Sequence, residues 1–194
     1  IDYPGANWSI AFDTVDINNN GMIVGYYSDG SKLHGFLKNG NNFSSIDYPN
    51  SYNTYALGIN NSGQIVGQYY DNSGMHGFLK DGVDFISIDY PGVRGTHAFD
   101  INDSGQIVGL NWDGLKYHGF LKDGASFNSF DYPGAYETWA NGINNGGQIV
   151  GRYWDETRTN YHGFLATPVP EPSTLLLLGS GLAGLAAIRR KFKN

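Results

Sequence analysis

The stretch Ile59-Asn60-Asn61-Ser62-Gly63-Gln64-Ile65-Val66-Gly67 decides the fold, because it occurs four times in nearly the same form. Each copy is preceded by an Asp-Tyr-Pro sequence and followed by His-Gly-Phe-Leu. The copies start near residues 1, 46, 88 and 130, with spacings of 45, 42 and 42 residues. This self-similarity indicates tandem structural repeats.

Each repeat is expected to form four short strands. In the second copy we place them at Thr54–Asn60, Gln64–Tyr70, Met75–Lys80 and Asp84–Tyr90. The Asn60 to Gly63 segment predicts a tight hairpin, because its glycine can adopt a positive φ. The 28 Gly, 14 Tyr and 11 Phe of the chain suit strands and turns. The Gln-Ile-Val-Gly strand is apolar on both faces, so each sheet must be covered by its neighbours.

Four-stranded units of about 42 residues favour an all-β fold of β-propeller blades over residues 1–166. The fourth copy stops at Ala166 without its last strand, and the chain opens with Ile1–Pro4, which resembles that strand. We therefore expect Ile1–Pro4 to complete the last blade of a closed four-bladed ring. A larger, truncated propeller and an open stack of sheets are the alternatives. Since the sequence starts with Ile1, either a signal peptide has been removed or the sequence is a fragment.

The composition changes abruptly after Ala166. Residues 167–174 form a Pro-rich linker. Residues 175–194 are expected to form a transmembrane helix with a basic end, because the 17 residues from Pro172 to Ile188 carry no charge. The basic cluster after this segment predicts that its end is cytoplasmic and that the repeats lie outside.

The tail resembles the PEP-CTERM sorting signal of exported bacterial proteins. The resemblance rests on a Val-Pro-Glu-Pro sequence, an apolar span and a terminal basic cluster. It implies processing by an exosortase, an inner-membrane-anchored precursor, and release to the cell surface or extracellular matrix of a Gram-negative bacterium that makes exopolysaccharide in biofilms. The residues assigned to the signal are Val169, Pro170, Glu171, Pro172, Arg189, Arg190 and Lys191.

The repeats of residues 1–166 are similar to the HAF repeats of extracellular bacterial proteins, although His-Gly-Phe stands where those repeats read His-Ala-Phe. The resemblance implies an extracellular setting and brings no catalytic residues.

Composition excludes some chemistry. The chain has no cysteine, so it has no disulfide and no thiolate site. Residues 1–166 contain 8 Lys and Arg against 17 Asp and Glu, which predicts no binding to nucleic acid. We expect no cofactor and no metal.

The repeated polar residues are interpreted as parts of the scaffold. The histidines at 34, 76, 118 and 162 are expected to be packed or hydrogen-bonded, since third-strand side chains lie too far apart to share a metal ion. The aspartates at 2, 47, 89 and 131 are expected to bond to backbone in a turn, and they are not taken as catalytic carboxylates. A weak calcium site at Asp100, Asn102 and Asp103 stays open as an alternative.

Aromatic residues rim the loops that differ between repeats. Large amphipathic rings on a rigid scaffold suit the faces of sugars. The candidate glycan-binding residues are Tyr27, Tyr70, Trp112, Trp139 and Trp154. Packing between blades is the alternative for each. The sequence therefore predicts a non-catalytic exported protein that binds polysaccharide or other matrix components. A structural fibre subunit and a glycan-degrading enzyme are the other candidates.

Overall fold

The computed structural model describes Ile1, Tyr3, Pro4 and residues 16–168, and every regular element in this part of the chain is a β-strand. The first repeat contains β1 (Asp16–Ile17), β2 (Ile23–Ser28), β3 (Leu33–Asn39) and β4 (Asn42–Ile46). The second contains β5 (Asn53–Ile59), β6 (Ile65–Asp71), β7 (Gly74–Asp81) and β8 (Asp84–Ile88). The third contains β9 (Gly95–Ile101), β10 (Ile107–Trp112), β11 (Tyr117–Asp123) and β12 (Ser126–Phe130). The fourth contains β13 (Ala135–Ile143), β14 (Ile149–Asp155) and β15 (Tyr161–Ala166).

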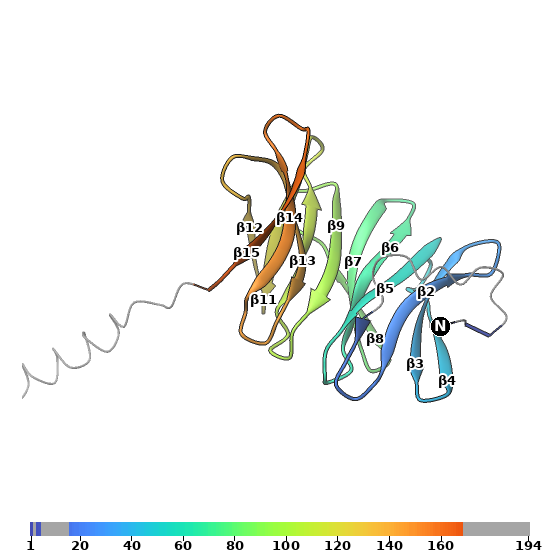
Figure 1. Ribbon diagram of the computed structural model, residues 1–194. Helices are drawn as coiled ribbons and strands as arrows, with labels where there is room; N and C mark the ends of the chain where they lie inside the picture. Colours follow the sequence, from blue (N-terminus) through green and yellow to red (C-terminus); the bar gives the residue numbers. More distant parts are fainter. Residues whose placement is uncertain (2, 5–15, 169–194) are drawn as a thin grey trace, which may run out of the picture.

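Each repeat forms one antiparallel sheet whose strands lie in chain order (Figure 1). A single parallel bridge between Met75 and Gly95 joins the second sheet to the third. The prediction of an all-β fold of four-stranded units is confirmed for the first three repeats, and the described part of the fourth has three strands.

The hairpin between the first two strands forms where the sequence predicts it. In the second sheet, the side-chain oxygen of Asn60 accepts hydrogen bonds from the backbone N–H groups of Ser62 (3.1 Å) and Gln64 (3.0 Å). Gly63 adopts a φ of 83°, which glycine tolerates without strain. This turn fixes the register of β5 against β6 and recurs in the other sheets.

The hydrophobic core lies between successive sheets. Val66 of β6 and Leu79 of β7 pack against Ala98, Ile101 and Ile107 of the next sheet. The equivalent residues form the other two clusters. The valines of β2, β6 and β10 are therefore covered by the following sheet, as the sequence predicts, and the interfaces between sheets hold the fold together.

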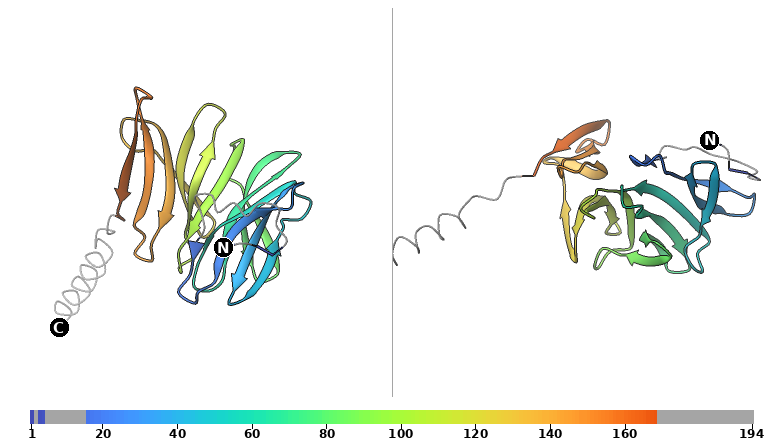
Figure 2. Two further views of the ribbon diagram at one scale, coloured as in Figure 1. Left: turned by 45° about the vertical axis from the view of Figure 1, so that its right-hand side comes forward. Right: turned by 90° about the horizontal axis from the view of Figure 1, so that it is seen from below.

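The four sheets follow one another around an arc, with β1, β5, β9 and β13 on its inner side (Figure 2). This arrangement is that of propeller blades. The prediction that Ile1–Pro4 closes the ring is wrong for the described residues. Tyr3 instead stacks on Tyr27 of the first blade, with ring centroids 3.8 Å apart, as Tyr48 stacks on Tyr69 in the second. The Asp-Tyr-Pro segment therefore leads into the blade that follows it, and no strand of the described residues pairs with the outer edge of β15.

The predicted transmembrane helix lies outside the described residues, as does most of the linker. Within the part of the chain that the structure describes, no helix is long and apolar enough to cross a membrane.

Candidate binding groove

In the first three blades the repeat histidine binds the aspartate of the Asp-Tyr-Pro sequence that follows it, and Asp2 lies outside the described residues. Nδ1 of His76 lies 2.7 Å from Oδ1 of Asp89, and its Nε2 faces Asp71 at 3.4 Å. His34 is held in the same way by Asp47 and Asp29, at 2.7 and 3.1 Å. The prediction that the repeat histidines are packed or hydrogen-bonded is confirmed, since His118 is held by Asp131 and Asp113 and His162 stacks on Tyr153 with ring centroids 5.1 Å apart. The prediction that the aspartates bond to backbone is wrong for Asp47 and Asp89, whose carboxylates accept from a histidine and a serine.

The other recurring residues also serve the scaffold. The hydroxyl of Thr54 accepts the N–H of Tyr48 at 2.9 Å, and this tyrosine stacks on Tyr69 at 3.6 Å. The opposite face of Tyr69 stacks on His76 at 5.0 Å. The recurring side chains are therefore occupied within and between blades.

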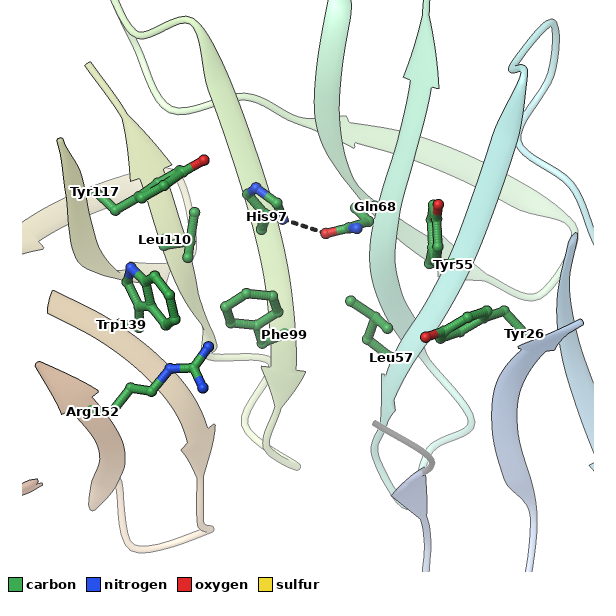
Figure 3. Close-up of a pocket in the computed structure, with 10 residues that line it drawn as sticks. All are labelled: Tyr26, Tyr55, Leu57, Gln68, His97, Phe99, Leu110, Tyr117, Trp139 and Arg152. Atoms are coloured by element: carbon green, nitrogen blue, oxygen red, sulfur yellow. Dashed lines mark hydrogen bonds between the residues drawn. The ribbon is translucent and has the colours of Figure 1, made fainter. Parts of the chain in front are cut away.

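Positions that differ between repeats converge on one groove of about 340 Å³ (Figure 3). The groove is lined by side chains from all four blades, namely Tyr26, Tyr55, Leu57, Gln68, His97, Phe99, Leu110, Tyr117, Trp139 and Arg152. They come from the inner strands and their neighbours. Most of the residues are aromatic or aliphatic, and no Asp or Glu is among these described lining residues.

The lining residues occupy equivalent positions. Tyr55, His97 and Trp139 hold one position of the inner strand, between a threonine and an alanine that do not change. A second position, one residue after an unchanging glycine, carries Tyr26, Gln68, Leu110 and Arg152. Because side chains alternate between the two faces of a strand, the unchanging neighbours face the core and the varying residues face the groove.

A β-bulge recurs on the inner strands and leaves one residue of each unpaired. The register of β5 shifts between Ala56 and Gly58, which leaves Leu57 without a partner, and β9 leaves Phe99 in the same way. A bulge re-aims the side chain of the extra residue. Both Leu57 and Phe99 line the groove.

Two polar atoms in the groove have no hydrogen-bond partner among the described residues: Nε2 of His97 and Nε1 of Trp139. Burial lowers the pKa of His97 to about 4, so its ring is neutral at pH 7. Its Nδ1 is hydrogen-bonded to Oε1 of Gln68, which can only accept, so the proton is on Nδ1 and Nε2 is an acceptor. The groove therefore holds one acceptor and one donor that can serve a ligand once small side-chain movements expose them.

Arg152 is the cation of the groove. Its guanidinium carbon lies 3.8 Å from the centre of the Trp139 ring and 5.6 Å from that of Tyr161. The side chain is exposed, and no carboxylate of the described residues lies within 4.0 Å of it. Its N–H groups are thus available for hydroxyl or carboxylate groups.

The five predicted glycan-binding residues have different surroundings. Trp139 lines the groove. Trp154 is outside the lining but stacks on Tyr161 at 5.5 Å, and Tyr161 in turn contacts Trp139 at 5.6 Å. Tyr70 lies edge-on to the lining residue Tyr55 at 5.9 Å. Trp112 lines an adjoining hollow of about 540 Å³ that shares Tyr117 with the groove.

Tyr27 is placed differently. It is buried, with Tyr3 stacked on one face of its ring and His34 on the other. This residue therefore packs the blade and does not reach the groove.

The structure places the carboxylates of the weak calcium site considered as an alternative. Asp100 accepts the N–H groups of Ile101 and Ile143, at 2.8 and 2.7 Å, and Asp103 binds Asn61 and Asn145. Across the described ranges, no group of three or more His, Asp or Glu side chains could hold a metal ion. The sorting-signal residues 169–172 and 189–191 lie outside the described residues.

Sequence reasoning missed His97, Gln68, Arg152 and Tyr117 as members of the groove. The signal that finds them is the comparison of the four copies with one another. At each of these places one position changes in chemistry from repeat to repeat, while at least one residue beside it stays the same.

Together, the sheets and the groove define a propeller-type repeat protein. Among solved structures, the chain is similar to one described as "The beta-propeller domain of the Trilobed protease from Pyrococcus furiosus", with 14% identity and a TM-score of 0.53. The match covers 81% of this chain and 50% of that one, so this chain spans half its length. At this identity the likeness shows the fold alone.

The family model of the PEP-CTERM protein-sorting motif matches residues 168–191. This motif is a substrate signal for an exosortase, and it implies an exported protein with a membrane-anchored precursor. No curated protein matches the chain.

Proposed function

We propose that this chain is a non-catalytic extracellular protein that binds polysaccharide in the groove between its blades. One observation carries the proposal: two strand positions that vary between the repeats, beside residues that are largely constant, line a single aromatic groove. Variation at groove-facing positions of a rigid scaffold is expected where side chains have been selected for a ligand and not for packing.

The chemistry of the groove suits a sugar. A pyranose ring has an apolar face of C–H groups and an edge of hydroxyls, so it needs ring faces beside a few directed polar groups. Tyr55 and Tyr117 supply aromatic surface. Nε2 of His97 can accept from a hydroxyl, while Nε1 of Trp139 and the guanidinium of Arg152 can donate to one.

The sorting motif also supports an extracellular protein that binds polysaccharide. An exosortase signal directs a protein to the outside of the cell, where polysaccharide is a main component of the matrix of biofilm-forming bacteria. The similarity of residues 1–166 to HAF repeats also favours an extracellular setting. We place the mature protein at the surface or in the matrix of a Gram-negative bacterium.

Hydrolysis of glycans is the competing proposal. Most glycoside hydrolases use two carboxyl groups that flank the scissile bond. The described residues lining the groove include neither Asp nor Glu, which favours binding over cleavage.

Screening the protein on a glycan array, followed by titration of each hit, tests the proposal. We expect saturable binding of at least one polysaccharide fragment and no release of reducing ends on prolonged incubation. Reducing ends that accumulate in proportion to enzyme would establish the hydrolase. An array without hits that includes the exopolysaccharide of the source bacterium would contradict binding.

A further inference from the structure

The three interfaces between blades repeat one pairing. A valine of the second strand packs in the same cluster as an isoleucine 35 residues later, at the end of the next inner strand. All six side chains are exposed by 9% or less. The pairs are Val24 with Ile59, Val66 with Ile101, and Val108 with Ile143.

The two ends of the arc carry the separate halves of this pairing. Val150 of the last blade is 51% exposed, and Ile17 of the first blade is 60% exposed. Leu165, which follows Leu37, Leu79 and Leu121 in the repeat, is 61% exposed, whereas those three pack on the neighbouring core. The last blade thus exposes the face that carries Val150 and Leu165. The first blade exposes Ile17, on the strand whose equivalents cover this face at the three interfaces.

Polar groups at the two ends are complementary in the same sense. The side-chain Nδ2 of Asn18, Asn60 and Asn102 donates to the backbone oxygen of the asparagine in the next blade, at 3.0, 3.2 and 3.1 Å. Nδ2 of Asn144 donates only to Gln148 among the described residues. Within the described ranges, the Asn144 amide therefore keeps a free donor, and the backbone oxygen of Asn18 accepts only from the turn N–H of Gly21.

We propose that the exposed face of the last blade binds the leading edge of the first blade of a second copy of this chain, head to tail. In this contact Val150 packs against Ile17, and Asn144 donates to the backbone oxygen of Asn18. Continuity with the three existing interfaces specifies the partner, because each copy carries both halves and the open arc separates them. Such a heterologous contact propagates into closed rings or filaments. Aligned copies would also present their grooves in series, which raises avidity for a polymer.

Cysteine crosslinking in the full chain tests the contact, since the native sequence has no cysteine. One preparation carries Val150→Cys and another, with a different tag, carries Ile17→Cys. Both are kept in the same detergent, mixed, and treated with a short bis-maleimide. The control is the double variant Val108→Cys with Ile143→Cys, whose pair lies inside one chain and calibrates the reagent. Each single variant alone measures crosslinking that does not depend on the pairing.

We expect the mixture to give a dimer carrying both tags, and the single variants to give little. Adding Asn144→Asp, which removes the amide donor, should lower the yield of that dimer. A double variant of Val150→Cys and Ile17→Cys that links only within its own chain, with no mixed dimer, would replace the proposal with ring closure. No link of either kind, when the interior control links, would also overturn it.

Discussion

The guanidinium carbon of Arg152 lies 3.8 Å from the centre of the Trp139 ring, so a cation covers one face of an aromatic side chain inside the groove. Stacking of this kind orients the guanidinium plane and leaves its N–H edge free. The arrangement places one directed positive charge in a domain whose residues 1–166 carry an excess of nine negative charges (8 Lys and Arg against 17 Asp and Glu).

Replacing Arg152 by leucine should therefore reduce any preference for sugars that carry a carboxylate. The third repeat has Leu110 at this position, so the scaffold accepts the residue. We expect the affinity for a uronate-containing fragment to fall about tenfold more than that for its neutral analogue, since hydrogen bonds to charged groups contribute about 1.5–3 kcal/mol. Parallel titrations of the two fragments measure this. Equal losses for both would show that Arg152 does not recognise charge.

The stability of the domain should depend on pH through Asp100. Burial, together with the nearby carboxylate of Asp16, raises the pKa of Asp100 from 3.8 to about 6, despite its two backbone hydrogen bonds. The folded state thus holds this proton more tightly than the unfolded state. Relative to Asp100→Asn, the wild type should lose up to about 3 kcal/mol of unfolding free energy as pH rises from 4 to 7.

Asp103→Asn is the control for this measurement. Hydrogen bonds from Asn61 and Asn145 lower the pKa of Asp103, so the wild type should lose stability relative to this variant as pH falls toward 3. Denaturant unfolding at several pH values gives both differences. If the stability difference between wild type and variant changed with pH in the same direction for Asp100 and Asp103, the opposite pKa shifts given to these two groups would be contradicted.

Gly109 should be intolerant of alanine. A Cβ at this position would overlap the carbonyl oxygen of His97 and the ring of Phe120. We expect Gly109→Ala to cost about 3 kcal/mol or more, because the two strands would have to separate. Gly163→Ala is the matched control, since its Cβ would meet only the oxygen of Gly151 at 3.8 Å. Thermal unfolding compares the two, and a stable Gly109→Ala protein would mean that the strands are less closely packed than described.

The sequence predicts the repeat units well, because turn chemistry and burial are local. In the second blade the predicted strand Gln64–Tyr70 differs by one residue at each end from β6. The predicted strand Asp84–Tyr90 is two residues too long. Asp89 turns to bind His76, and the N–H of Tyr90 is taken by Thr96, so neither joins the sheet.

Contacts between distant residues were harder to predict. The pairing of His76 with Asp89 depends on the register of β7 against β8. The stacking of Tyr3 on Tyr27 depends on which blade the Asp-Tyr-Pro segment joins. The groove was found only in part for a similar reason. Tyr26 and Tyr27 are adjacent, but their side chains lie on opposite faces of β2. Choosing Tyr27 instead of Tyr26 therefore selected a core residue in place of a groove residue.

The sorting motif makes a prediction about export. Replacing Pro170 and Glu171 together by alanine should leave the protein uncleaved in the inner membrane, because these residues belong to the matched motif. Fractionation and mass measurement of the chain in a host with the exosortase detect this. Replacing Thr167 by serine, just before the matched residues 168–191, should leave release unchanged. Normal release of the double variant would show that the Pro-Glu-Pro sequence is not the signal.

The central claim is that the varying positions that face the groove bind the ligand, whereas positions outside the groove do not. Exchanging residues between repeats tests it, because each new residue already occurs at the same place in another blade. In one protein Trp139→Tyr and Arg152→Gln copy Tyr55 and Gln68. In the control Tyr153→Asn copies Asn111, away from the groove.

The decisive measurement is the affinity of both proteins for the same glycan fragment, with the unfolding midpoint recorded for each. The account predicts that the groove exchange weakens binding by about 2 kcal/mol, or roughly thirtyfold, with little change in stability. The control should keep the wild-type affinity. Unchanged affinity after the groove exchange, or an equal loss in the control, would contradict the claim.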